Sequence, residues 1–114
     1  MVLTTGAGQV ANTINVGGFG FAAEEIEEVL IMHPDIDEIA AFSIRHPVLG
    51  EQVAVALKSK RFLAINELKE FCRNDLEPYK IPAKMIRMKI LPKTHSGKIQ
   101  RNLCREQLII RGEI

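Results

Sequence analysis

The fold is decided near the start of the chain, where residues 14–21 read Ile-Asn-Val-Gly-Gly-Phe-Gly-Phe. Two short apolar alternations flank Gly17 and Gly18, and glycine readily takes the positive φ that both central positions of a tight hairpin turn require. This stretch therefore predicts an antiparallel β-hairpin. The spacing of the apolar residues changes directly after it, which places a helix next to the hairpin in the chain.

That helix is predicted over residues 23–32. Its apolar side chains Ile26, Val29 and Leu30 recur at the spacing of one helix face, so we expect them in the core. Four glutamates crowd the first turns, where the helix dipole favours negative charge. Pro34 ends the pattern, because proline cannot continue a helix.

Two longer apolar segments follow, at residues 36–44 and 51–59. The first is rich in apolar and β-branched residues, and the second alternates Val53, Val55 and Leu57 with smaller or polar neighbours. Both patterns are typical of strands. The short loop between them predicts an antiparallel pair.

The remainder of the chain predicts four more segments, at residues 65–74 (helix), 77–82 (extended strap), 85–90 (strand) and from Lys98 or Ile99 onward (helix). The strap follows from its prolines, because each disfavours helix in the residue before it. The last helix is expected to carry Leu103, Gln107 and Ile110. The order of elements predicts an α+β fold, with an N-terminal β-hairpin followed by a small three-stranded sheet packed with about three helices.

Composition and length are those of one globular domain. The chain has 114 residues, 46% hydrophobic and 25% charged, with no apolar run long enough to span a bilayer. Residues 1–13 are rich in Gly and Thr and predict a hinge or linker before a domain over residues 14–114. Cys72 and Cys104 follow no metal-binding spacing. We expect them to be buried or half-buried free thiols in a cytoplasmic protein, with a disulfide as the alternative.

Charge is unevenly distributed along the chain. Residues 1–79 carry 6 basic and 12 acidic side chains, whereas residues 80–114 carry 9 basic and 2 acidic ones. A basic end of this kind can attract a polyanion such as a nucleotide, coenzyme A, an acidic carrier protein or nucleic acid. It can equally be a solvated surface without a partner. Because aromatic residues are few and no recognition motif is present, we do not expect nucleic acid to be the partner.

The most informative stretch for function is residues 92–99, Pro-Lys-Thr-His-Ser-Gly-Lys-Ile. It offers backbone N–H groups, hydroxyls and ammonium groups to an anion, between a predicted strand and a predicted helix. It is not a phosphate-binding P-loop, because Gly97-Lys98 is followed by Ile99 instead of Ser or Thr. The pattern alone also allows an ordinary polar surface turn.

Residues 92–99 resemble the C-terminal signature of the acyl-adenylate-forming superfamily, which includes acid–CoA ligases, peptide-synthetase adenylation domains and luciferases. That signature reads Pro-Lys-Thr-x-x-Gly-Lys-Ile with a basic residue two positions later, here Arg101. Residues 14–27 resemble the family's hairpin and first helix, and residues 76–82, Leu-x-Pro-Tyr-x-Ile-Pro, resemble a third family motif. The resemblance extends from residue 8 to about residue 108.

The resemblance implies that the chain is the C-terminal lid domain of an AMP-forming acid–thiol ligase. Members activate a carboxylate with ATP and then pass the acyl group to coenzyme A or to the phosphopantetheine of a carrier protein, and the lid rotates between these steps. Lys98 matches the catalytic lysine of the first step. Gly17, Gly18 and Phe19 match the hairpin that faces the thiol in the second step. No metal site is implied in this domain, because Mg²⁺ accompanying ATP is bound mainly by the large domain.

Further candidates for nucleotide or phosphate contacts lie around Lys98, and they are Lys93, Thr94, Ser96, Gly97 and Arg101. Lys93 and Arg101 could equally hold the loop in place, and Thr94 and Ser96 could cap the last helix. Asn12 is the hinge candidate, since asparagine tolerates unusual φ values.

The sequence departs from the family pattern before the hairpin. Gln9 stands where the family has a nucleotide-binding arginine, and Ala11 or Asn12 where it has an acidic residue. The large N-terminal adenylating domain has no counterpart in the 114 residues, so we expect the chain to act only with such a domain, in cis or in trans. The acid is selected by that domain in the family. The alternative is a stand-alone, non-catalytic interaction module that kept the fold and lost the reaction.

Overall fold

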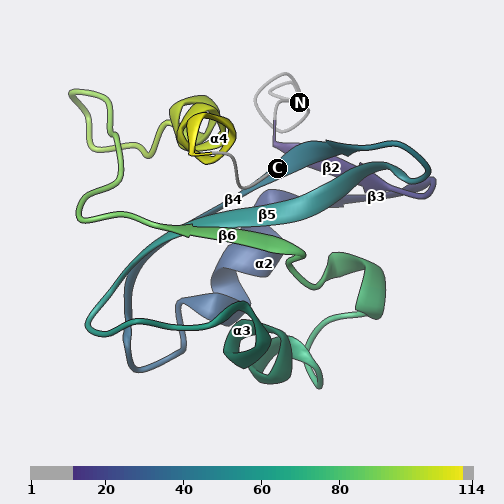
Figure 1. Cartoon of the computed structure of the whole chain (residues 1–114), viewed down its shortest axis with the longest axis horizontal. Helices are drawn as coiled ribbons and strands as arrows, with labels where there is room; N and C mark the ends of the chain where they lie inside the picture. Colours follow the sequence, from purple (N-terminus) through teal and green to yellow (C-terminus); the bar gives the residue numbers. More distant parts are fainter. Residues whose placement is uncertain (1–11, 112–114) are drawn as a thin grey trace, which may run out of the picture.

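The computed structural model describes residues 12–111 and shows a single sheet with helices on both faces (Figure 1). Its elements in chain order are β2 (Thr13–Val16), β3 (Phe19–Ala22), α2 (Ala23–Leu30), β4 (Ile36–His46), β5 (Gly50–Ser59), α3 (Ile65–Cys72), the 3-10 helix η1 (Pro78–Lys80), β6 (Lys84–Arg87) and α4 (Arg101–Ile110). The predicted α+β class is confirmed.

Strand β5 is the centre of the sheet. Along one edge it pairs antiparallel with β4, from Ile36 opposite Ser59 to His46 opposite Gly50. Its other edge is shared: β2 meets it antiparallel where Val16 faces Gly50, and β6 runs parallel to it farther along. The hairpin and the predicted three-stranded sheet are thus one five-stranded sheet within the described residues.

The hairpin β2–β3 closes as its sequence predicts. Val16 pairs with Phe19 across a two-residue turn, and the turn residues Gly17 and Gly18 have φ values of +58° and +92°. Positive φ at both positions gives the twist that matches a right-handed pair of strands. The turn is also held from outside, because the Gly17 N–H donates to the carbonyl of Leu49 at 2.9 Å.

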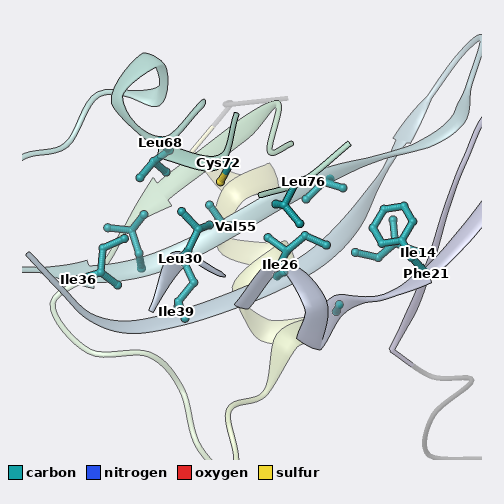
Figure 2. Close-up of a cluster of buried hydrophobic side chains, with 14 of the residues drawn as sticks. Ile14, Phe21, Ile26, Leu30, Ile36, Ile39, Val55, Leu68, Cys72 and Leu76 are labelled. Carbon is teal, nitrogen blue, oxygen red and sulfur yellow. The ribbon is translucent and has the colours of Figure 1, made fainter. Parts of the chain in front are cut away.

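The two faces of the sheet bury different kinds of side chain. Helices α2 and α3 cover one face, and α4 covers the other (Figure 1). The larger core lies under α2 and α3, where Val55 of β5 lies with Leu30 and Leu68 (Figure 2). Val53 and Leu57 of β5 belong to the same cluster. Burying one such aliphatic side chain stabilises a fold by about 2 kcal/mol.

The opposite face of β4 and β5 combines alanines with Phe42 and Ile44, and α4 packs on it. Ala40, Ala54 and Ala56 lie in this second cluster with Cys104 and Leu108 of α4. Helix α4 contains the three residues expected in it, Leu103, Gln107 and Ile110, and its buried residues are Cys104 and Leu108. Of the three residues that it was expected to carry, Leu103 is 39% exposed and Ile110 is 72% exposed.

Three further details of the predicted elements are corrected. The strap over residues 77–82 contains the turn η1, since Pro78 occupies its first position and a proline is tolerated at a helix start. Strand β6 ends at Arg87 instead of residue 90. Helix α4 begins at Arg101 instead of Lys98 or Ile99, because the N–H of Gln100 bonds back to the carbonyl of Pro92 and keeps the chain in the preceding loop.

Both cysteines are free and buried, as predicted. Cys72 belongs to the core under α2 and α3, and Cys104 to the cluster under α4. Burial raises the pKa of each thiol to about 11, so both stay protonated at neutral pH. Among the described residues, no helix combines the length and the apolarity needed to cross a membrane.

Candidate functional site

The loop that joins β6 to α4 folds into a tight turn around Lys98. Lys93 and Ile99 pair antiparallel, and the Thr94 N–H donates to the carbonyl of Lys98 at 2.8 Å. The Gly97 N–H donates to the carbonyl of Thr94 at 2.9 Å, with φ of +89° at Gly97, which a side chain would disfavour. We call residues 93–101 the lysine loop. Its backbone bonds make it a compact unit.

The hydroxyls of the lysine loop serve the turn itself. Thr94 Oγ1 accepts the Lys98 N–H at 3.2 Å and lies 3.0 Å from Ser96 Oγ. The expected alternative, that Thr94 or Ser96 caps the last helix, is wrong, because α4 has Gln100 as its N-cap and no side-chain cap. Both hydroxyls remain on exposed residues, where an anion can reach them.

Lys93 lies at the β6 end of the lysine loop and is tied to β4. Its Nζ lies 2.9 Å from Glu38 Oε1 and 3.2 Å from the carbonyl of Leu91. The hydrogen bond from Lys93 lowers the pKa of the Glu38 carboxyl, more than partial burial raises it. The ammonium is therefore engaged with the body of the domain.

Arg101 lies at the other end of the lysine loop and is tied to α2. Its Nε and Nη2 donate to the two carboxylate oxygens of Glu27 at 2.9 and 2.8 Å, and Nη2 lies 3.6 Å from Glu24. Burial of the guanidinium opposes its charge, but the hydrogen bonds and the charge of Glu27 outweigh burial and raise the Arg101 pKa. Such a two-pronged pair fixes orientation as well as distance.

Lys98 differs from both neighbours. Its side chain is exposed, and across residues 12–111 its ammonium makes no hydrogen bond or ion pair. The turn therefore presents one unpaired cation while the cations at its ends are neutralised. Those acidic partners, Glu27 and Glu38, were not found from the sequence, because they lie 74 and 55 residues from the groups that they bind.

The other predicted segment, the hairpin turn, lies at the opposite end of the sheet from the lysine loop (Figure 1). Phe19 is 59% exposed, and its ring stacks on Tyr79 with centroids 4.7 Å apart. The Gly18 N–H donates to Asn15 Oδ1 at 3.1 Å. An exposed aromatic ring beside two glycines gives a flat surface that a ligand can approach closely.

Asn12, the hinge candidate, is the first described residue. Its carbonyl accepts the Ala23 N–H at 2.9 Å, and its Nδ2 donates to Glu24 Oε2 at 2.9 Å. An aspartate could not make this second bond at neutral pH, because two carboxylates would meet. Gln9 and Ala11 lie outside the described residues. No group of three metal-binding side chains occurs between residues 12 and 111.

The sequence and fold comparisons define the class of protein. Residues 25–98 match the family described as the AMP-binding enzyme C-terminal domain, and the chain therefore belongs to that family. This confirms the resemblance drawn from residues 14–27, 76–82 and 92–99.

Its relatives are CoA ligases. The chain is 36% identical over 108 residues to the oxalate–CoA ligase of Saccharomyces cerevisiae, a match that covers 93% of this chain and 19% of the relative. It is 33% identical over 90 residues to the mitochondrial malonate–CoA ligase of Homo sapiens, covering 77% and 16% of the two chains. The chain thus spans about a fifth or less of the length of these relatives.

Solved structures give the same class. A Bacillus subtilis o-succinylbenzoate–CoA synthetase bound to a product analogue superposes with a TM-score of 0.81 at 27% identity, covering 84% of this chain and 20% of that one. A Mycobacterium tuberculosis fatty acyl-CoA synthetase superposes with a TM-score of 0.80 at 29% identity, covering 88% and 20%. The described fold is therefore that of a domain found in larger CoA ligases.

Proposed function

We propose that the chain is the lid domain of an AMP-forming acid–CoA ligase and that it delivers Lys98 to the adenylation step. One observation carries the proposal: Lys98 is the cation of the lysine loop that stays unpaired within the described residues, between the paired Lys93 and Arg101. An exposed ammonium on a hydrogen-bonded turn is suited to enter an active site in a second domain. Asn12, beside the start of the sheet, is the proposed hinge, which leaves residues 1–13 as the connecting segment and 14–114 as the lid.

The chemistry of adenylation explains why a lysine is needed there. The carboxylate attacks the α-phosphorus of ATP and displaces pyrophosphate, so negative charge grows on the phosphoryl oxygens. A positioned ammonium stabilises that charge more in the transition state than in the ground state, which raises the rate. Lysine is a compact charge on a flexible stem, which suits a group that must arrive and leave.

The second step is assigned to the hairpin. We propose that Gly17, Gly18 and Phe19 face the pantetheine arm of the thiol, with coenzyme A as the acceptor because the relatives are CoA ligases. Thr94, Ser96 and Gly97 remain candidates for contacts to the nucleotide phosphates. The large N-terminal domain is the proposed partner, selects the acid, and binds the Mg²⁺ that accompanies ATP. Two free thiols are in keeping with a cytoplasmic location.

The test joins this chain to the large domain of the S. cerevisiae oxalate–CoA ligase, in place of that enzyme's own equivalent domain. Oxalate-dependent exchange of pyrophosphate into ATP then reports adenylation. We expect Lys98→Ala to lower this rate by roughly 10²–10³, as the loss of one transition-state donor does. Lys89→Ala removes an exposed lysine of the same basic segment outside the lysine loop and should leave the rate unchanged.

Two outcomes would contradict the proposal. If the chimera is active and Lys98→Ala exchanges pyrophosphate as fast as the parent, Lys98 is not the adenylation lysine. If the chain is folded in the chimera but no exchange occurs, while the yeast enzyme's own domain restores it, the alternative of a non-catalytic interaction module is favoured.

A further inference from the structure

We infer that Glu38 and Glu27 are positioning residues for Lys98, each anchoring one end of the lysine loop to the body of the domain. The inference rests on the proposed role of Lys98 and adds two residues that lie outside the loop. Both act through another side chain, Glu38 through Lys93 and Glu27 through Arg101.

The first anchor joins the beginning of the lysine loop to β4. Glu38 Oε1 lies 2.9 Å from Lys93 Nζ, with 26% and 29% of the two side chains exposed. The same ammonium donates to the carbonyl of Leu91, whose side chain is 1% exposed in the cluster beneath α4. This end of the loop is therefore tied to both a strand and the core.

The second anchor joins the end of the lysine loop to α2 and β4 together. Glu27 Oε2 accepts the N–H of Ala41 at 2.8 Å as well as Arg101 Nε, and Oε1 accepts Arg101 Nη2. Ala41 lies on β4, which ends the sheet order β3-β2-β5-β4. Within residues 12–111 this carboxylate therefore completes a backbone bond that no neighbouring strand supplies. Both carboxylate oxygens of Glu27 accept hydrogen bonds, which leaves the Arg101 side chain little freedom to move.

Between the two anchors the loop is bonded to itself. The bonds from Thr94 N–H to the Lys98 carbonyl and from Gln100 N–H to the Pro92 carbonyl are each 2.8 Å long. A turn that is internally bonded moves as one piece, so its two ends set the direction of Lys98. Misplacing a reacting group by about 1 Å can cost roughly 10²-fold in rate.

A charge exchange separates this role from direct phosphate binding by Lys93. The double variant Lys93→Glu with Glu38→Lys restores the ion pair but reverses the charge on the loop. An anchoring role predicts that the double variant recovers most of the activity lost in either single variant. A contact between Lys93 and the phosphates of ATP predicts that the double variant is as slow as Lys93→Glu alone or slower, which would overturn the Glu38 anchor.

The kinetic experiment uses the chimera described above and follows the two half-reactions separately. We expect Glu38→Gln and Glu27→Gln each to lower pyrophosphate exchange by roughly 10- to 100-fold. Thioester formation from supplied oxalyl-adenylate and coenzyme A should be unchanged. Asp37→Asn and Glu28→Gln are matched controls on the same strand and helix: the first breaks an ion pair with Lys60, the second touches no residue of the lysine loop, and both should leave exchange at the parental rate.

Three results can be told apart. Equal losses in both half-reactions would show a general folding role and overturn the inference. If Glu38→Gln and Glu27→Gln both exchange pyrophosphate at the parental rate while Lys98→Ala is slow, the inference is overturned and the proposed function stands. Full exchange in Lys98→Ala would remove the proposed function itself.

A second measurement needs only this chain. Backbone ¹⁵N relaxation reports the order of the Gly97 and Lys98 amides on the fast timescale. We expect the order parameters of both to fall in Glu38→Gln and in Glu27→Gln and to stay at the parental value in Asp37→Asn. Parental values in all three variants would overturn the anchoring role.

Discussion

Single residues set the geometry of the hairpin turn that we assign to the thiol step. At Gly18, φ is +92°, and a β-carbon added there would meet no atom within 4 Å. Any cost of a side chain at this position is therefore backbone strain and not crowding. At Gly17, φ is +58°, and an added β-carbon would lie 3.5 Å from Leu49, which is ordinary contact.

We expect Gly18→Ala to lower the free energy of unfolding by about 1 kcal/mol, because an L-residue in the left-handed region is strained. Urea denaturation of the chain measures the change. Gly20→Ala is the matched control in β3: Gly20 has no positive φ, its added β-carbon would have only ordinary contacts at 3.9 Å, and the change should stay within about 0.5 kcal/mol. Equal losses for the two variants would show that the strain argument is wrong.

At the scale of elements, α4 follows the lysine loop and covers one face of the sheet. Its buried residues are Cys104 and Leu108, which pack on the alanines of β4 and β5 and on Phe42 and Ile44 of β4. We expect Leu108→Ala to lower the free energy of unfolding by about 2–4 kcal/mol, since it leaves a cavity at a fully buried site. Ile110→Ala, at a position that is 72% exposed, should change it by no more than about 0.5 kcal/mol. A larger loss for Ile110→Ala than for Leu108→Ala would show that Ile110, and not Leu108, lies in the core.

The elements that the sequence predicts well are those fixed by neighbours in the chain. The Gly17-Gly18 turn, the face of α2 and the β4–β5 pair depend on local spacing, and all three are confirmed. The face of α4 depends on what the sheet presents to it, which is a mixture of alanines with Phe42 and Ile44. Its starting residue depends on a bond from Gln100 back to Pro92. Neither is contained in the pattern of the helix itself.

The same distinction applies to the candidate site. The sequence predicts Lys98 as a site residue because the residues on either side of it form a recognisable local motif. Glu27 and Glu38 lie in segments far from Lys98 in the chain. Each has other acidic residues next to it, and the sequence does not show which of them contacts the lysine loop. Only the packing of α2 and β4 against the lysine loop separates them from Glu28 and Asp37.

At the scale of the whole molecule, the lysine loop and the hairpin turn lie at opposite ends of one sheet (Figure 1). The sheet is continuous between them, because β5 pairs with the hairpin strand β2 near one end and with β6 toward the other. The two segments therefore cannot approach a single active centre at the same time. If both serve one reaction, the domain must rotate as a body between the two steps.

Opposite effects of two variants would reveal that rotation. In the chimera with the yeast large domain, we expect Phe19→Ala to slow thioester formation from oxalyl-adenylate by roughly 2- to 10-fold, which corresponds to the loss of an aromatic contact of about 0.5–1.5 kcal/mol. Pyrophosphate exchange should be unchanged, because the proposed rotation turns the hairpin away from the active centre in that step. Lys98→Ala should give the converse pattern. Phe62→Ala removes another exposed aromatic ring, 69% exposed and outside both segments, and should alter neither step. Loss of pyrophosphate exchange in Phe19→Ala at parental stability would mean that both segments act in one pose, and the rotation would have to be abandoned.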